Sequence, residues 1–496
     1  MIELLPDISI KLDHILSGLP QLMPELVLAA TFLSSIGSGL FVDHRWRHGT
    51  FTITLAGIIL AGTFSVLQLV APTASGALFG TMSIDDFGRY IRILTGAISL
   101  LFVLFVHGNS EFKAHPKKTA DLYSILIAVQ IGLNLMGMAT SWLMVFVAVE
   151  MVSIGSYLMV GYLAREPLQA EASMKYVLFG SVCSAVMLYG LSFLYGFTGN
   201  LDFTSPEHIQ GLIDTGPLLV GAVLLFVFAG LGFKLSFVPF HFWTPDVYQG
   251  APTPVTAFLS TVPKIAGIAL LARILYAWPA DSYAYQHLHT LILLSAVATM
   301  LLGNLAALAQ TNIKRMMAYS SIGHTGFLMM AVLAYSTGEY TILLFYLTVY
   351  GLMNMGVFML ADYIEARTGA VDVEGYRGLG KVLPLACICF VVLLVSLTGL
   401  PPTAGFVAKI LVFSAVFNQW QHTGEIGMIV LLIVGALTTV VSLFYYFKVP
   451  LNAFLRKRER ASEIAALPSS IVGVALLITT AVLLLGIFPG WLIGLF

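Results

Sequence analysis

The most regular feature of the chain is a succession of long apolar stretches separated by short charged or Gly/Pro-rich connectors. A bilayer core about 30 Å thick needs around 20 apolar residues per α-helix, and most of these stretches reach that length. The pattern predicts an all-α polytopic membrane protein of about fourteen transmembrane helices. The predicted spans lie near 22–41, 51–71, 89–107, 122–139, 142–163, 173–197, 217–238, 254–276, 288–309, 316–336, 340–362, 382–420, 425–448 and 469–495.

Two of these spans carry helix-breaking residues in their interior. The seventh runs into a proline-rich polar segment at 239–252, and the twelfth, 382–420, is too long for one crossing and is interrupted at Pro401–Pro402. Proline removes a backbone donor and bends or breaks a helix. Irregular backbone at membrane depth is tolerated only where it is buried in protein or lines a wet cavity. The breaks therefore predict that helices 7 and 12 are discontinuous and lie along a transport pathway.

The two breaks lie five spans apart, which suggests an internal repeat. Five crossings are an odd number and reverse the chain direction, so the second copy must be inverted relative to the first, as in many transporters. The predicted organisation is three N-terminal helices in 1–120 and a first repeat of helices 4–8 in 121–277. A second, inverted repeat of helices 9–13 follows in 278–449, and a connector with helix 14 occupies 450–496.

Composition excludes the other common classes. Hydrophobic residues make up 58% of the chain and charged residues 10%, against about 25% charged in a soluble domain. The three cysteines, Cys183, Cys387 and Cys389, lie in apolar segments, so neither a disulfide framework nor a zinc or iron–sulfur site is expected. The sequence has no glycine-rich phosphate loop and no nicotinamide-binding fingerprint. Any redox chemistry would therefore belong to another chain.

Lysines and arginines segregate to alternate connectors, which predicts the orientation in the membrane. One side holds Arg45, Arg47, Lys113, Lys117, Lys118, Arg165, Lys314, Arg315, Arg367, Arg377, Lys381, Lys448, Arg456, Lys457, Arg458 and Arg460, and the other holds Lys11, Arg89, Arg92 and Arg273. Basic residues concentrate in cytoplasmic loops. We therefore expect the basic side to face the cytoplasm, with the cluster at 456–460 meeting anionic lipid and both termini on the periplasmic side of a bacterial inner membrane.

The candidate chemistry lies in the few charged residues inside the spans, because an ionisable group at the centre of a membrane helix costs about 2.5–3.5 kcal/mol. Glu150 is midway along the fifth span, and Lys234 lies five residues before the first break. A desolvated lysine gives up its proton more readily and a nearby carboxylate holds it, so moving the partner would gate a proton. Lys264, midway along the eighth span, and Lys409, after the second break, are the relay candidates. The alternative is that these charges only hold helices together.

Weaker candidates for the proton path are Lys175, His241 and His324. Lys175 lies near a cytoplasmic end, where its side chain could reach water. Histidine relays protons near neutral pH, although hydrogen-bonded packing is an equal alternative. Asp246, at the first break, is interpreted as a polar cap, and Glu25, near the start of the first span, as an interfacial residue.

Two segments resemble signatures of a known family. Segment 232–264, which contains Trp243-Thr-Pro-Asp246-Val-Tyr248, resembles the N subunit of bacterial NADH-quinone oxidoreductase, respiratory complex I. Segment 310–324 resembles a motif shared by the antiporter-like subunits of complex I and by multisubunit sodium/proton antiporters. The M and L subunits and the antiporters usually carry a leucine-proline version of the first element, so the resemblance favours the N subunit.

The resemblance implies a proton-translocating membrane subunit of an NADH:quinone oxidoreductase. It implies Glu150 and Lys234 as an input pair, Lys264 as the central relay, Lys409 as the exit, and His241 and His324 as linking polar groups. It implies no cofactor in this chain, with NAD, flavin, iron–sulfur clusters and quinone bound by partner subunits. The implied partners are other membrane-arm subunits, especially those of the K and M types, and no nucleic acid. A sodium/proton antiporter subunit and a non-pumping scaffold remain the alternatives.

Overall fold

The structure is a computed structural model that describes residues 16, 18–42, 48–71, 76–78, 80–115, 119–163, 167–334, 340–457 and 470–496. Thirteen helices in these ranges are long and apolar enough to cross a membrane. They are α2 (Met23–Gly37, with η1 Leu19–Leu22 and η2 Ser38–Val42), α3 (Gly49–Val70), α4 (Asp86–Gly108), α6 (Ala120–Met138), α7 (Trp142–Val160), α8 (Pro167–Thr198), α10 (Pro217–Leu235), α12 (Thr253–Tyr276), α13 (Tyr283–Leu308), α14 (Ile313–Leu333), α15 (Thr341–Thr368), α19 (Ile426–Pro450) and α20 (Ser470–Ile487).

The remaining predicted span, 382–420, is divided between α17 (Pro384–Thr398) and α18 (Ala404–Thr423). The all-α class is confirmed apart from a small antiparallel hairpin of β1 (Gly76–Leu78) and β2 (Met82–Ile84). The short elements are α5 (Ser110–Ala114), α9 (Pro206–Thr215), α11 (Trp243–Gly250), η3 (Val373–Tyr376), α16 (Leu379–Val382), η4 (Leu451–Leu455) and α21 (Gly490–Ile493).

Both predicted breaks are present, and side chains satisfy the backbone groups that they free. In the first, α10 ends at Leu235, the following Ser236 adopts a left-handed conformation with φ 60°, and the Trp243 indole donates to the Phe233 carbonyl at 3.0 Å. In the second, the amide of Gly405 donates to the Ser396 hydroxyl at 3.1 Å. Unpaired carbonyls and amides in a membrane interior are costly. These contacts therefore stabilise the broken geometry.

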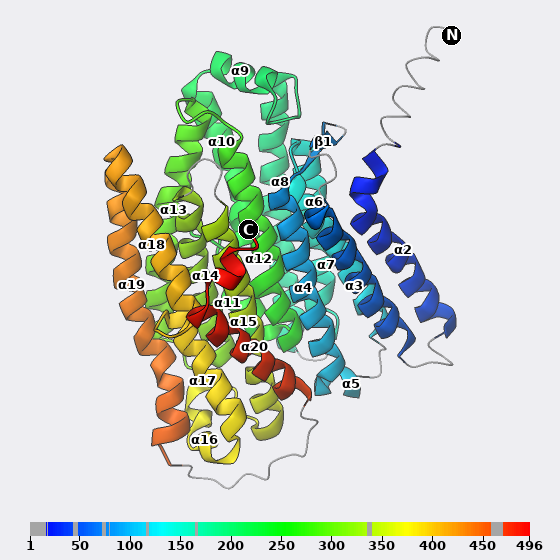
Figure 1. Ribbon diagram of the computed structural model, residues 1–496, viewed down its shortest axis with the longest axis vertical. Helices are drawn as coiled ribbons and strands as arrows, with labels where there is room; N and C mark the ends of the chain where they lie inside the picture. Colours follow the sequence, from blue (N-terminus) through cyan, green and yellow to red (C-terminus); the bar gives the residue numbers. More distant parts are fainter. Residues whose placement is uncertain are drawn as a thin grey trace.

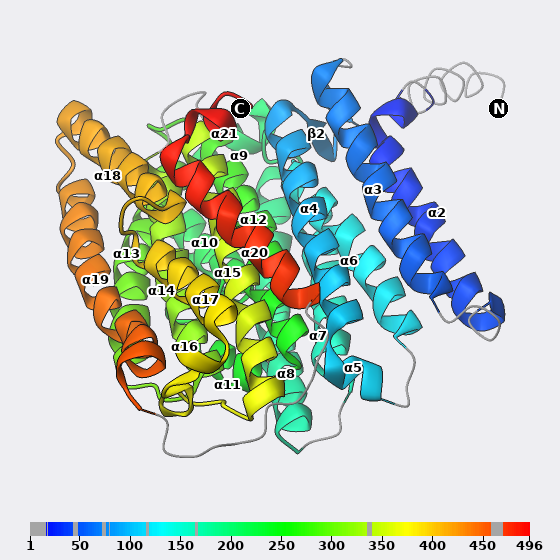
Figure 2. The ribbon, with the colours of Figure 1, turned by 60° about the horizontal axis from the view of Figure 1, so that its bottom comes forward.

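The helices form a central group flanked by more exposed neighbours. The apolar stretch of α12 is entirely buried, whereas α2, α3, α8, α19 and α20 bury only about a third or less of theirs. Figure 1 shows α2 and α3 at one edge, α18 and α19 at the other, and α10 and α12 between them. Figure 2 shows α20 crossing the face formed by α15 and α17, both of which it packs against. The core therefore surrounds the helix that carries Lys264.

The molecule has two polar ends. We call the end that carries α5, α11 and α16, at the bottom of Figure 2, the basic end, because the basic connectors lie there. The end with α9, the β-hairpin and α21 is the opposite end. Of the residues on which the orientation prediction rests, Lys11, Arg45, Arg47, Lys117, Lys118, Arg165, Arg458 and Arg460 lie outside the described residues.

Candidate functional site: a row of buried lysines

Lys234 lies in the last turn of α10, with only 4% of its surface exposed. Its ammonium donates to the hydroxyl of Ser153 on α7 at 3.2 Å. Glu150, one turn earlier on α7, is half-buried and accepts a hydrogen bond from the hydroxyl of Ser184 on α8. The predicted pair is therefore close in the fold, but the ion pairs found among the described residues do not join Lys234 to Glu150. Each charge is instead bound to a serine.

Lys264 lies at the middle of α12 and is 1% exposed. Its ammonium donates to three oxygens of α14: the carbonyl of Ser321 at 3.2 Å, the hydroxyl of Ser321 at 2.8 Å and the hydroxyl of Thr325 at 3.1 Å. The Ser321 hydroxyl also pairs with that of Tyr350 on α15 at 2.9 Å. All of these partners are neutral. Charged lysine can donate to all three oxygens, and a neutral amine can donate to the carbonyl while it accepts from a hydroxyl, so this environment suits both forms of the lysine.

His324 occupies the next position along α14 toward Lys409. It is 4% exposed, and its Nδ1 pairs with the Tyr346 hydroxyl at 3.0 Å. Its Nε2 lies 3.4 Å from the Tyr446 hydroxyl, which is bonded in turn to Ser320. The imidazole is therefore bound on both sides by hydroxyl groups that can donate or accept, as a relay requires.

Lys409 lies in the first turns of α18, after the second break, and is 4% exposed. Its ammonium donates to the carbonyl of Thr398 at 2.8 Å and so caps the end of α17. It also lies 4.7 Å from the centre of the Phe327 ring on α14. Helix α14 thus contacts Lys264 and Lys409 and carries His324 between them.

Two weaker candidates lie apart from this row. Lys175, whose side chain is 37% exposed, forms ion pairs with Glu171 at 2.8 Å and Asp246 at 2.6 Å. Asp246 also binds Arg315 at 2.7 Å, which places Lys175 in a charge cluster at the basic end. His241 is buried in the turn between α10 and α11, where its ring lies tilted against that of Phe242 with 4.4 Å between the ring centres.

Asp246 gives a test of pH dependence outside the membrane-spanning helices. Burial raises its pKa, but hydrogen bonds from Lys175 and Arg315 outweigh burial and lower the pKa below its usual value. A lowered pKa contributes stability that is present above the pKa of the unfolded chain and is lost as pH falls through the folded pKa. We expect Asp246→Asn to lower the melting temperature of the solubilised complex at pH 7 and to have little effect at acidic pH. An equal decrease at both pH values would contradict this account.

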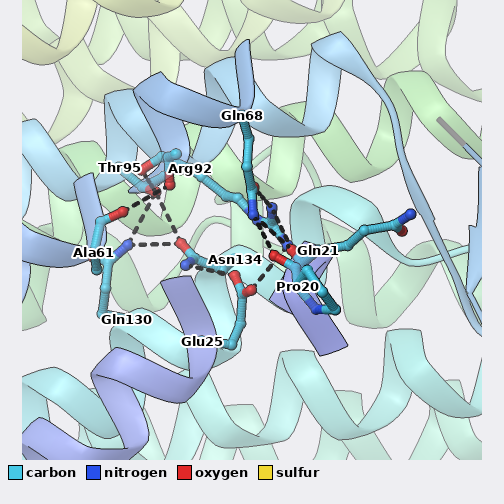
Figure 3. Close-up of polar contacts among 10 residues, drawn as sticks. Pro20, Gln21, Glu25, Ala61, Gln68, Arg92, Thr95, Gln130 and Asn134 are labelled. Carbon is cyan, nitrogen blue, oxygen red and sulfur yellow. Dashed lines mark hydrogen bonds and ion pairs between the residues drawn. The ribbon is translucent and has the colours of Figure 1, made fainter. Parts of the chain in front are cut away.

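A second buried polar cluster was missed by the sequence interpretation. Glu25, expected at the interface, is only 8% exposed, and Arg92, expected in a connector, is 2% exposed within α4. Their side chains pair at 2.9 Å, and the Asn134 amide donates to Glu25 at 3.0 Å (Figure 3). Gln130 extends the cluster by donating to Asn134 at 2.9 Å, and Gln68 accepts from Arg92 at 3.1 Å. The cluster joins α2, α3, α4 and α6.

The helical spacing of these polar residues was the signal that could have revealed the cluster. Thr95 also belongs to the cluster, because its hydroxyl accepts from the Gln130 amide at 3.1 Å. Arg92 and Thr95 are three residues apart on α4, and Gln130 and Asn134 are four apart on α6, so each pair shares one helix face. Polar faces in membrane helices turn toward other helices rather than lipid. The pairing of Glu25 with Arg92 joins positions far apart in the sequence and needs the fold to be seen.

Comparison with known proteins identifies the class of membrane subunit to which this arrangement belongs. A family model described as NADH:quinone oxidoreductase/Mrp antiporter, transmembrane, matches residues 139–442. That segment contains both broken helices and all the buried lysines of the row. The chain is therefore one of the antiporter-like membrane subunits.

Individual relatives identify the subunit family within this class. Subunit N 2 of NADH-quinone oxidoreductase from Chloroherpeton thalassium is 38% identical over 93% of this chain and 91% of its own length. A chain of respiratory complex I from Thermus thermophilus, solved with bound aureothin, is 30% identical, with a TM-score of 0.78 over 95% of this chain and 99% of its own. This chain belongs to the subunit N family of NADH-quinone oxidoreductases. A chain of the Mrp complex from Dietzia also has a TM-score of 0.78, at 20% identity over 96% of each chain, and shares the fold.

Proposed function

We propose that this chain translocates protons across a bacterial inner membrane as a membrane subunit of an NADH-quinone oxidoreductase. The observation that carries the proposal is the row of three lysines buried at the centre of the helix bundle, each bound to neutral oxygens. A scaffold would gain more from apolar packing, because burying a charge without a counter-charge is unfavourable. A lysine that must bind and release a proton needs such neutral surroundings.

The proposed pathway runs from Lys234 through Lys264 and His324 to Lys409. Serine, threonine and tyrosine hydroxyls surround Lys264 and His324, and they can reverse donor and acceptor roles as a proton passes. Lys409 donates to a backbone carbonyl and lies over an aromatic ring beside the second break, which places it at the far end of the row. The row thus has a hydroxyl-lined relay and ends at the second broken helix.

Glu150 would control the first step. In the structure it is bound to Ser184 while Lys234 is bound to Ser153, so the pair is separated. If Glu150 moved to contact Lys234, its charge would increase the affinity of the lysine for a proton. We expect Glu150→Gln to slow NADH-driven proton translocation several-fold, with assembly unchanged. Ser184→Ala is the matched control that removes only the hydrogen bond, and it should retain most of the activity. Equal losses in both variants would argue for a structural role.

The two halves of the row would belong to inverted repeats in 121–277 and 278–449. The packing of helices supports this division. In the first half α10 and α11 pack on α8, and α6 packs on α7 and α12. In the second half α17 and α18 pack on α15, and α13 packs on α14 and α19. The corresponding helices follow the same order along the chain, with 1–120 and 450–496 outside the repeats.

Orientation, partners and cofactors follow from the family and the charge distribution. The basic end would face the cytoplasm and both termini the periplasm. The neighbours would be other membrane-arm subunits, with the K and M types as the proposed contacts. NAD, flavin, iron–sulfur clusters and quinone would be bound by partner subunits, so this chain would contribute proton transfer and no redox step.

The rival function is sodium/proton exchange, which the shared fold permits. The experiment is to measure the pH gradient formed by the reconstituted complex during NADH oxidation, with and without sodium, in wild type and Lys234→Ala. We expect a sodium-independent gradient that is strongly reduced in the variant. A gradient that requires sodium would favour the antiporter, and a variant that assembles and pumps like wild type would favour the scaffold.

A further inference from the structure

Asp362 is a buried carboxylate near the basic end that the row of lysines does not include. It lies in the last two turns of α15 and is 8% exposed. Both of its oxygens accept hydrogen bonds of 2.9 Å from the side-chain amide of Asn109, which follows α4. The ion pairs found among the described residues do not include Asp362. A buried carboxylate held only by an amide is free to bind a proton, because no cation fixes its charge.

Two cavities meet at this carboxylate. One, of about 470 Å³, is also lined by residues 249–253, where α11 ends and α12 begins, and by Lys314 and Glu365. The other, of about 350 Å³, is lined by Lys113, Tyr363 and Ile471. Both lie at the basic end and both are large enough to hold water. Asp362 is therefore placed where a proton from the solution at that end can reach it.

The charged groups that line the two cavities with Asp362 come from three helices. Glu111 and Lys113 belong to α5, Lys314 belongs to α14, and Glu365 lies one turn further along α15. Two are acidic and two are basic, so neither sign dominates. Lys314 donates to the carbonyl of Ala251 and not to a carboxylate of this group. The surroundings therefore leave Asp362 able to hold a proton and to release it.

Polar groups also occur deeper along α15 toward Lys264, beyond the apolar residues 355–361. Asn354, about two turns earlier on α15, has a buried side-chain oxygen without a protein partner. Buried polar atoms are nearly always bonded to protein or to water, so this atom marks a position for water. One turn beyond Asn354, the Tyr350 hydroxyl reaches the Ser321 hydroxyl that binds Lys264.

We propose that Asp362 takes up protons from the solution at the basic end and supplies them to Lys264. The carboxylate accepts a proton from water in the cavities and later returns it to a chain of water molecules. The neutral amine of Lys264 receives the proton at the inner end of that chain. No electron moves and no other reactant is needed. This inference rests on the proposed proton-translocating function and adds the site of uptake.

The test is NADH-driven proton translocation by the intact reconstituted complex, measured against pH on the basic side, in wild type, Asp362→Asn and Asp362→Glu. We expect Asp362→Asn to slow translocation several-fold and to flatten the pH profile, at an unchanged level of assembly. Asp362→Glu keeps the carboxyl group and should retain translocation, with a shift in the midpoint of the pH profile. A purely structural role would impair both variants in assembly and leave the midpoint where it is in wild type, which would overturn the proposal.

Lys264→Ala, measured in parallel, distinguishes a failure of the uptake site from a failure of the proposed proton-translocating function. If Lys264→Ala stops translocation while Asp362→Asn has the rate and pH profile of wild type, the uptake site is wrong and the proposed function stands. If Lys264→Ala translocates normally, the proposed function fails and the uptake site fails with it. An unshifted midpoint in Asp362→Glu contradicts the uptake site even where the asparagine variant does not assemble.

Discussion

Lys264→Ala is expected to reduce NADH-driven proton translocation several-fold while the complex still assembles. The side chain is the central member of the row and is bound only by hydroxyl and carbonyl oxygens of α14. Its removal leaves those hydroxyls close enough to Tyr350 and to the helix backbone to keep hydrogen bonds, so the bundle loses little stability. The relay, in contrast, loses the group that holds the proton.

The measurement is the number of protons moved per NADH oxidised in sealed vesicles. Lys381→Ala serves as the matched control, because it removes a lysine near the basic end that lies outside the row. We expect the control to keep the wild-type ratio. A wild-type ratio in Lys264→Ala, with normal assembly, would remove Lys264 from the pathway.

The largest effect on stability is expected from the cluster that joins the N-terminal helices to α6. Arg92→Met leaves the Glu25 carboxylate buried without its cation, and breaking a buried ion pair in this way costs about 3–5 kcal/mol. The double variant Glu25→Gln with Arg92→Met removes both charges and should recover a large part of that loss. The readout is the thermal stability of the solubilised complex and the amount of this chain in it.

The comparison of single and double variants separates charge from packing. If the ion pair acts as described, the two substitutions are strongly non-additive, with the double variant more stable than Arg92→Met alone. Additive losses would mean that each side chain contributes through packing only. Glu171→Gln is a suitable control, because this carboxylate pairs with Lys175 but the two side chains are 58% and 37% exposed, and exposed pairs contribute little.

The sequence was sufficient for the helices and for their breaks. Apolar length predicted the spans, and the prolines at 239 and 401–402 predicted the discontinuous helices, because both signals act locally. The family was also predictable, since the motifs at 232–264 and 310–324 are continuous in sequence. The roles of the individual site residues stay predictions.

Contacts between distant positions could not be predicted in the same way. The partners of Lys264 on α14 lie 57 and 61 residues away, and the binding of Lys234 to Ser153 in place of Glu150 depends on side-chain geometry. Glu25 was misplaced because a carboxylate near a helix start has the same local pattern whether it meets water or a buried arginine. Side-chain packing in the folded protein, and not the hydrophobic periodicity of the sequence, determines these contacts.

Lys264→Arg tests the central claim most directly. Arginine keeps the positive charge and a long side chain, but it does not release its proton in proteins. The account predicts that Lys264→Arg reduces proton translocation during NADH oxidation several-fold in the assembled complex, as Lys264→Ala does. Translocation at the wild-type ratio in the arginine variant would show that only the charge at this position matters, and it would contradict a relay through Lys264.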